Sequence, residues 1–392
     1  MPFSPQHIYS IISLSVKFVY PQNLGKPVIF TRFSPFYLHH FLDVLYFICY
    51  LLLKKDKFQK ETIHYLPRKG CIMMQEPVSI QEFSARLTQN IGRVIKGKDE
   101  VIRKVVVCLL CGGHILLEDL PGTGKTTLVK SLARSVGGSF TRVQFTPDLL
   151  PSDLTGANIY NQKTQEFHFK PGPVFTNMLL ADEINRATPR TQSSLLECME
   201  EGQVTVDGET HRLTPPFFVA ATQNPIEIQG TFPLPEAQLD RFFMRLSMGY
   251  PNAESEREML TAFQESIPLE ELEPVLSTED ILEAQNQVRK IRVSQAVQEY
   301  LLQIVAATRS HDQIRLGVSP RGSLAFLRAA QAWAGLEGRE YVLPDDVKAV
   351  CCDVLSHRII CKGSHLSQTS DTVRPVLEKI LEQTPVPMES PV

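Results

Sequence analysis

Three short aliphatic runs in the middle of the chain each end in polar or charged residues. They are HILLE (114–118), NMLLADEINR (177–186) and FFVAATQNP (217–225). Apolar runs of this length are typical of strands that are buried on both faces of a parallel sheet. Because the carboxyl ends of parallel strands share one edge of the sheet, we expect the polar groups that follow these runs to meet there.

A different pattern begins after residue 250. Four segments show the apolar periodicity of amphipathic helices, with Ser or Pro-Asp at some starts and Gly at some ends: TEDILEAQNQVRKI, SQAVQEYLLQIVAATRS, SPRGSLAFLRAAQAWAGLEG and PDDVKAVCCDVLSHRI. His357 and Arg358 in the last segment are assigned only a role at the C-terminus of a helix. The pattern predicts an α/β domain with a parallel sheet over residues 73–250, followed by a small all-helical domain and a short tail over residues 251–392.

Two segments inside the first domain alternate polar and apolar residues around short turns. TGANIYNQKTQEFHFKPGPV (155–174) precedes the second aliphatic run, and GQVTVDGETHRL (202–213) contains an Asp-Gly pair between alternating residues. Such alternation around Asp-Gly is a strong signal of a two-stranded hairpin. Both segments are therefore predicted to be hairpin insertions.

Residues 1–72 differ in character from the rest of the chain, with many aromatic residues and more basic than acidic ones. Their apolar run, residues 41–53, is interrupted by Asp43 and is shorter than the roughly 20 residues that a membrane-spanning helix needs. It also begins too far into the chain for a signal peptide. Met73 and Met74 precede sequence of ordinary character, so we interpret the extension as a misassigned start. A weak membrane anchor or a docking helix is the alternative.

The composition narrows the class of protein. The chain is 43% hydrophobic and 21% charged, and its formal charge of −3 gives no overall attraction to nucleic acid or acidic membranes. The eight cysteines are scattered, which fits a reducing compartment such as the cytoplasm. Cys108 and Cys111 form a CxxC, but VVVCLLCGG is typical of a core helix that ends at glycine.

A glycine-rich turn joins the first aliphatic run to a segment with helical periodicity, in LLEDLPGTGKTTLVKSLARSV. Backbone N–H groups in such a turn surround a phosphate, and the helix N-terminus adds partial positive charge. We expect Lys125 to reach the β- and γ-phosphates of ATP and Thr126 to bind Mg²⁺. Asp119 replaces the first glycine of the usual pattern, which weakens the match without removing the chemistry. The predicted nucleotide-binding residues are Pro121, Gly122, Thr123, Gly124, Lys125, Thr126 and Thr127.

The second and third runs end in groups that suit phosphoryl transfer. Asp182 would hold the Mg²⁺ water shell, and Glu183 would polarise the attacking water. Asn224 would bind the γ-phosphate or orient that water. Acidic residues at strand ends are often only solvated, and Asn-Pro is a common turn. Their combination with a phosphate-binding turn nevertheless predicts magnesium-dependent ATP hydrolysis.

The order of these motifs resembles the MoxR family of AAA+ ATPases over about residues 76–385. The motifs are LLEDLPGTGKT, LLADEINR, FFVAATQNP, LPEAQLDRFFMR and GVSPRGS. The resemblance implies an AAA+ P-loop NTPase domain with a helical lid. It also relates the two hairpins to insertions of magnesium chelatase subunits and ring helicases. Residues 94–97 in RVIKGKDEVI resemble the segment that packs against adenine in these ATPases, although Lys96 and Lys98 fit surface positions as well.

The resemblance further implies a ring of identical subunits, usually a hexamer, with nucleotide at each boundary. Arg241 in DRFFMR would be the arginine finger that completes a neighbour's site, with Arg245 as the alternative. Arg321 would be a second sensor that touches the γ-phosphate of its own subunit. A salt bridge from Arg241 to Asp240 or Glu236 is the simpler alternative for that residue.

The resemblance also suggests what the motor acts on. MoxR relatives are chaperone-like and often work with proteins that carry von Willebrand factor A domains, which favours a remodelling or assembly function. A motor subunit like that of magnesium chelatase is the second hypothesis, and a nucleic-acid motor is the third. Asp207 and Glu209 at the tip of the second hairpin argue against the third, because a DNA-gripping hairpin needs basic residues there.

Overall fold

The computed structural model describes residues 78–224, 230–265, 267–362 and 370–387. The predictions for residues 1–72 fall outside this part of the chain, as do residues 225–229 after Asn224. None of the helices in the described part has both the length and the apolar character that crossing a membrane requires.

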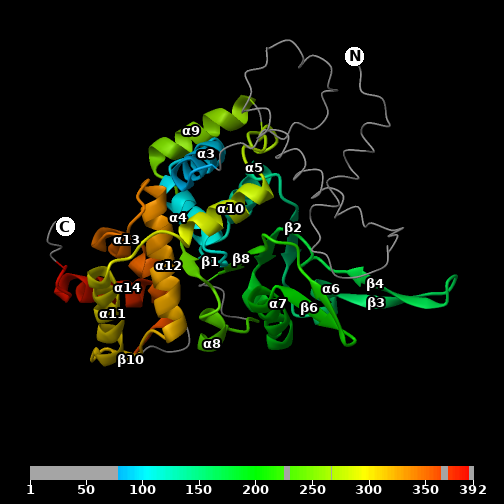
Figure 1. Cartoon of the computed structure of the whole chain (residues 1–392). Helices are drawn as coiled ribbons and strands as arrows, with labels where there is room; N and C mark the ends of the chain where they lie inside the picture. The colour runs from blue at the N-terminus through cyan, green and yellow to red at the C-terminus, as the bar shows by residue number, and fades with distance from the viewer. Residues whose placement is uncertain (1–77, 225–229, 266, 363–369, 388–392) are drawn as a thin grey trace, which may run out of the picture. The chain divides into compact units, whose positions relative to one another are not determined.

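A five-stranded sheet in the order β2-β5-β8-β1-β9 lies at the centre of the fold (Figure 1). The strands are β1 (Ile115–Glu118), β2 (Phe140–Gln144), β5 (Met178–Asp182), β8 (Phe218–Gln223) and β9 (Met244–Leu246). Every neighbouring pair is parallel. The carboxyl ends of β1, β5 and β8 therefore share one edge, as the three aliphatic runs predicted, while β2 and β9 are additional strands.

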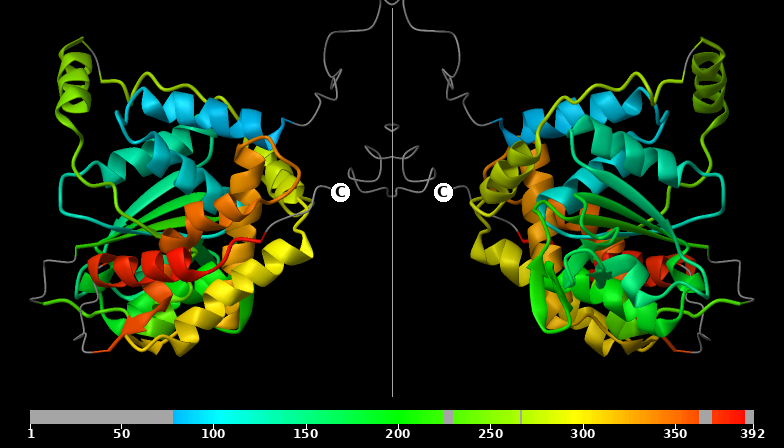
Figure 2. Two further views of the ribbon diagram at one scale, coloured as in Figure 1. Left: turned by 90° about the vertical axis from the view of Figure 1, so that its left-hand side faces the viewer. Right: turned by 90° about the vertical axis from the view of Figure 1, so that its right-hand side faces the viewer.

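Helices cover both faces of the sheet because successive strand residues point to opposite sides. One face packs against α3 (Ile80–Gly92), α4 (Asp99–Leu110) and α5 (Lys125–Ser135). The other face packs mainly against α7 (Pro189–Glu201), with the short helix α6 (Pro151–Thr155) beside it. Figures 1 and 2 show α3, α4 and α5 on one side of the sheet and α7 on the other. Both faces of the sheet are thus buried, as expected for parallel strands.

The two predicted hairpins are present. The first consists of β3 (Gly156–Asn161) and β4 (Glu166–Pro171), and the second of β6 (Gln203–Val206) and β7 (Glu209–Arg212). Asp207 and Gly208 form the second turn, with φ of 51° and 85°. Asn158 Nδ2 donates to Asp207 Oδ2 at 2.8 Å, so the two hairpins contact each other.

The C-terminal region is helical, as predicted. It contains α9 (Ala253–Glu265), α10 (Thr278–Val288), α11 (Gln295–Ser310), α12 (Pro320–Leu336), α13 (Pro344–Leu355) and α14 (Ser370–Gln383). A short antiparallel pair, β10 (Ile314–Leu316) and β11 (Ile360–Cys361), adds to the helices. Strands of two or three residues are too short to produce a periodic signal in the sequence.

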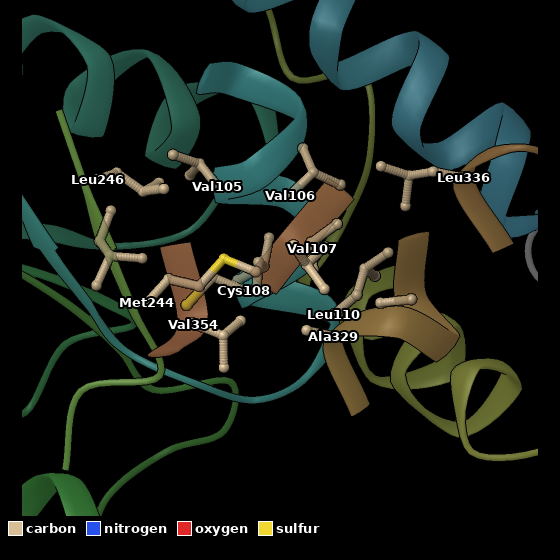
Figure 3. Close-up of a cluster of buried hydrophobic side chains, with 14 of the residues drawn as sticks. Val105, Val106, Val107, Cys108, Leu110, Met244, Leu246, Ala329, Leu336 and Val354 are labelled. Carbon is tan, nitrogen blue, oxygen red and sulfur yellow. The ribbon is translucent and has the colours of Figure 1, made fainter. Parts of the chain in front are cut away.

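Helix α4 lies between the sheet and the helices of the C-terminal region. Figure 3 shows Val105, Val107 and Cys108 of α4 together with Met244 of β9, Ala329 of α12 and Val354 of α13. All of these side chains are almost completely buried and belong to one continuous hydrophobic cluster. The N-terminal and C-terminal parts of the described chain therefore share a core.

The CxxC cysteines lie at the end of α4. Cys108 is buried and Cys111 is partly buried, and both are free thiols. Burial raises the pKa of each thiol, which keeps it protonated and unreactive at neutral pH. The predicted core role therefore fits their surroundings.

Candidate active site

The predicted phosphate-binding turn lies between β1 and α5. Gly122 and Gly124 have φ of 83° and 92°, a conformation that favours glycine, and Gly124 caps the N-terminus of α5. Lys125 Nζ donates to the carbonyl oxygens of Asp119 at 2.6 Å and Leu120 at 3.2 Å. The amine is thus held on the turn, beside the start of an 11-residue helix.

Asp119 has a structural role that the sequence pattern did not reveal. Its carboxylate accepts hydrogen bonds from Ser247 Oγ at 2.8 Å, Met248 N at 2.5 Å and Gly249 N at 3.0 Å. These donors follow β9, on the strand's carboxyl side. The aspartate therefore joins the phosphate-binding turn to the segment that leaves the sheet.

The two predicted catalytic acids follow β5 at the same edge. Thr222 of β8 connects them: its hydroxyl donates to Asp182 Oδ1 at 2.6 Å and accepts the Glu183 N–H at 2.8 Å. Glu183 has a left-handed backbone with φ of 57°, which is uncommon for a residue with a side chain outside turns and recurs at functional sites. Sequence reasoning missed Thr222, although a hydroxyl near the end of a predicted strand was a usable signal.

Strand β2 supplies further contacts to the acids. Arg142 Nη2 lies 2.6 Å from Asp182 Oδ2, and Gln144 Nε2 donates to Glu183 Oε2 at 2.6 Å. Arg186 Nε is 3.1 Å from the same Glu183 oxygen. These residues hold both carboxylates in defined positions. Arg142 and Gln144 were not predicted, because β2 was not recognised as a strand.

The two acids act electrostatically on Lys125. Burial lowers the pKa of Lys125, while Asp119, Asp182 and Glu183 each act to raise it. The turn follows β1 and the acids stand at the end of β5, so both lie at the carboxyl edge of the sheet. Asn224 directly follows β8, between the ends of β1 and β5, and so lies at this edge too. The turn, the acids and Asn224 are therefore brought together as predicted.

The segment predicted to face adenine also lies beside the turn. Val94 and Ile95 are buried, and Ile95 Cδ1 is 4.0 Å from the position of a Cβ built on Gly124. Lys98 Nζ donates to the Tyr250 carbonyl at 2.8 Å. Buried apolar side chains of this segment therefore adjoin the glycine-rich turn.

Arg241 and Arg321 lie together, but at the opposite edge of the sheet. Arg241 Nε is 3.1 Å from Glu200 Oε2, and Arg321 Nη1 is 3.0 Å from Glu200 Oε1. The preceding residue, Met199, accepts at 3.0 Å from Nε2 of His114, which directly precedes β1. The phosphate-binding turn follows the other end of β1.

The same-subunit phosphate contact expected for Arg321 is therefore not formed in this structure. The lid packs on α4 and β9, and Ser319, the N-cap residue of α12, bonds Asp240, which places the start of α12 at the amino edge of the strands. Burial is the main cause of the lowered pKa of His114 at this edge, and the charge of Arg321 lowers it further. Its guanidinium is paired with Glu200 and faces away from its own Lys125.

Arg245, the alternative finger, belongs to β9, and its side chain is buried. Its side chain is 5% exposed and lies 3.5 Å from Glu118 Oε2 on β1, whereas the side chain of Arg241 is 31% exposed. A finger must reach a neighbouring subunit, so the exposure favours Arg241. The salt bridges to Asp240 or Glu236 considered for Arg241 are replaced by its pair with Glu200.

The site suits a magnesium ion that is shared with phosphates. Within the described ranges, no cluster of three or more His, Cys, Asp or Glu side chains could hold a metal by protein ligands alone. Mg²⁺ typically uses one or two protein ligands together with substrate phosphates and water. Asp182 and the Thr126 hydroxyl, at the start of α5, would be ligands of that kind.

Comparison with known proteins agrees with this architecture. The model of the ATPase family associated with various cellular activities (AAA) matches residues 114–244, and that of the AAA lid domain matches residues 306–380. The chain is 42% identical over 308 residues to Chaperone MoxR1 of Mycobacterium tuberculosis, covering 76% of this chain and 80% of that protein. It is 34% identical over 321 residues to Protein MoxR of Paracoccus denitrificans, covering 75% and 93%.

A solved structure of a candidate ATPase from Cytophaga hutchinsonii superposes with a TM-score of 0.72 at 39% identity, covering 79% of this chain and 96% of that one. The sheet order, phosphate-binding turn, acid pair and lid together define an AAA+ ATPase. More specifically, the chain belongs to the MoxR family. Members of the wider AAA+ class bind nucleotide with a divalent metal and typically assemble in rings.

Proposed function

We propose that this protein hydrolyses ATP to ADP and phosphate and uses the cycle to remodel or assemble partner proteins. The observation that supports it is the convergence of Lys125, Asp182 and Glu183 at one edge of the sheet. A phosphate grip, a metal-binding carboxylate and a base are the groups that phosphoryl transfer to water requires.

Each residue has a defined part in the proposed reaction. Backbone N–H groups of residues 122–126 and the Lys125 amine bind the phosphates, while Thr126 and Asp182 hold Mg²⁺, which neutralises charge on the phosphate oxygens when bound. Glu183 takes a proton from water as the water oxygen bonds to the γ-phosphorus. The bond to the bridging oxygen breaks, and ADP leaves. Asn224 orients the water.

The arginine pair supports a ring in which subunits complete one another's sites. Arg241 and Arg321 lie at the edge of the sheet that is opposite to their own phosphate-binding turn. Their side chains are partly exposed. A neighbour's nucleotide is the anion that both can reach, and a supplied arginine stabilises the transition-state charge. We propose a hexamer, as the family resemblance implies.

The first hairpin favours a protein as the client. It exposes Ile159, Tyr160 and Phe167, which are 50%, 49% and 70% accessible. Exposed apolar side chains of this kind suit contact with a polypeptide. The acidic tip of the second hairpin gives no grip on phosphates. A protein with a von Willebrand factor A domain is our candidate partner.

The ATPase proposal is tested by Glu183→Gln. The variant should bind ATP with unchanged affinity and lose at least about a hundredfold in kcat, because the amide cannot accept the proton. Glu197→Gln, on the exposed surface of α7, is the matched control and should keep the parental rate. Hydrolysis by Glu183→Gln at the parental rate would rule out Glu183 as the base.

The client proposal is tested with the same trap. Glu183→Gln rings loaded with ATP should retain a von Willebrand factor A domain partner in a binding assay, and adding Phe167→Ser with Tyr160→Ser should reduce that binding. Strong stimulation of the wild-type ATPase by DNA, with no response to the partner, would favour a nucleic-acid motor instead.

A further inference from the structure

Asp240 lies at a junction between the predicted arginine finger and the lid. It directly precedes Arg241, and its carboxylate accepts from Arg358 Nε at 2.8 Å and from Ser319 Oγ at 3.0 Å. Ser319 is the N-cap residue of α12, and Arg321 is the second residue of that helix. One carboxylate thus contacts the segments that carry both arginines of the pair.

Arg358 is the buried partner in this junction. Its side chain is 2% exposed, and it donates through Nη2 to the Phe242 carbonyl at 2.6 Å and through Nη1 to the Phe243 carbonyl at 3.1 Å. Burial lowers the pKa of Arg358 to about 10, although Asp240 acts to raise it. The guanidinium is therefore charged at neutral pH and grips the chain on the C-terminal side of Arg241.

The tips of the two arginines converge as well. Both pair with Glu200, as described above, so Arg241 and Arg321 are linked at their backbone ends through Asp240 and at their guanidinium ends through Glu200. Asp240 is half-buried, with a side chain 23% exposed, and its bonds join the sheet domain to the lid. A closed arrangement of this kind restricts independent movement of either arginine.

We propose that Asp240, held by Arg358 and Ser319, is a positioning residue that fixes Arg241 and Arg321 as one unit for the nucleotide of the neighbouring subunit. Movement of the lid then moves both arginines together. This inference rests on the proposed function in one respect, namely that Arg241 acts across a subunit boundary.

The physical reason is pre-organisation. Charged donors stabilise a transition state most when they are already oriented, because no reorganisation is then needed during the reaction. A misplacement of about 1 Å can reduce a rate about a hundredfold. A buried arginine that bonds a carboxylate and two carbonyls supplies such rigidity, and lysine cannot reproduce its planar set of donors.

Mixed rings separate this positioning role from a general effect on folding. Arg241→Ala subunits keep an intact catalytic edge but lack the finger, and Glu183→Gln subunits keep the finger but cannot hydrolyse ATP. Rings that contain both should be active at the mixed boundaries. An inactive mixture would overturn the proposed action of Arg241 across the boundary, and this inference with it.

Arg358→Lys is then placed in one subunit type at a time. In the Glu183→Gln subunit, which donates the finger, it should lower kcat of the mixed ring about tenfold or more and leave KM for ATP within about twofold. In the Arg241→Ala subunit, which hydrolyses ATP, it should leave the rate close to that of the parent mixture. A purely structural role would affect both placements alike, and equal losses, or no loss in either, would overturn the proposal.

Two further variants complete the experiment. Ser319→Ala removes one hydrogen bond to Asp240 and leaves the buried charge of Arg358 in place. It should lower kcat more in the Glu183→Gln subunit than in the Arg241→Ala subunit, by a smaller factor than Arg358→Lys. If Arg358→Lys does not fold, Ser319→Ala tests the proposal in its place. Arg339→Lys is the matched control, because Arg339 forms a comparable ion pair with Asp346 within the lid, away from Asp240. It should leave both mixtures unchanged.

Discussion

Asp119 illustrates how one residue can depart from a motif for a structural reason. The usual phosphate-binding pattern has glycine there, and the sequence alone presents Asp119 as a weaker match. In the fold its carboxylate is almost fully buried and accepts three hydrogen bonds from the chain that leaves β9. Asp119 therefore lacks the conformational freedom of glycine but connects the phosphate-binding turn to the segment after β9 by hydrogen bonds.

We predict that Asp119→Asn destabilises the protein by about 1–3 kcal/mol, because the amide nitrogen cannot accept and a buried donor is left unpaired. The affinity for ATP should also fall as the turn loosens. Urea unfolding and nucleotide titration measure the two effects. Asp312→Asn, at an exposed position, is the control and should change stability by less than about 0.5 kcal/mol. Equal effects of the two substitutions would contradict the tether.

His114 gives a pH-dependent prediction. It is buried, with Nδ1 accepting the Val219 N–H at 3.0 Å, and burial lowers its pKa from 6.5 to about 4. The unfolded state therefore binds more protons between these values. The stabilising contribution is complete above pH 6.5 and is lost as the pH falls toward 4, by about 3 kcal/mol in total.

The measurement compares urea unfolding of the wild-type protein with His114→Gln. Because glutamine does not titrate, the difference in unfolding free energy between the two should fall by about 3 kcal/mol from pH 6.5 to 4. His168→Gln, at an exposed histidine, should behave as the wild type over this range. A difference that stays constant with pH would refute the assignment.

Among the secondary structure elements, several with strong local signals were predicted individually, whereas helices α3, α7, α9 and α14 were not singled out although they are amphipathic too. Asp-Gly at the second hairpin and the long amphipathic helices α11 and α12 carry their own patterns, since turn chemistry and 3.6-residue periodicity are local properties. Strands β2 and β9 were not recognised. Strand β2 exposes polar residues at the sheet edge, and β9 has three residues, so neither produces an aliphatic run.

The base of the first hairpin is expected to depend on one aromatic side chain. Phe169 stacks on His211 of the second hairpin, with centroids 3.8 Å apart, and meets Phe175 edge-on. Phe169→Ala should lower the free energy of local unfolding of the hairpin by about 1–1.5 kcal/mol. The hydrogen exchange of the β3 and β4 amides should then become about tenfold faster. Phe167→Ala, nearer the tip, removes an equal side chain that is 70% exposed and should leave this exchange nearly unchanged. Similar exchange in both variants would contradict the coupling of the hairpins.

At the scale of the whole described molecule, the core crosses the predicted boundary at residue 250. Helix α4 is buried between β9 and the lid helices α12 and α13 (Figure 3). The boundary between the two domains stays a prediction, and any movement of one part against the other would have to preserve this shared core. The arginine pair also depends on this packing, because the position of the lid brings Arg321 beside Arg241.

A shared core predicts cooperative unfolding. Leu110→Ala on α4 should lower the unfolding free energy by about 2–5 kcal/mol and shift one common calorimetric transition to lower temperature. Leu324→Ala, on the exposed side of α12, is the control and should shift it little. Two separate transitions, of which only one responds to Leu110→Ala, would show that the two parts unfold independently.

The sequence by itself determined the glycine-rich turn after β1, the acid pair at the end of β5, the hairpins and the helical character of the C-terminal region. These follow from turn chemistry, residue type at strand ends and periodicity, which depend on neighbouring residues. Only the tertiary structure decided the tether at Asp119, the contacts of Arg142, Gln144 and Thr222 with the acids, and the place of Arg321. Each of those joins segments that are far apart in the chain, and the geometry of such a contact exists only when the sheet and lid have packed together.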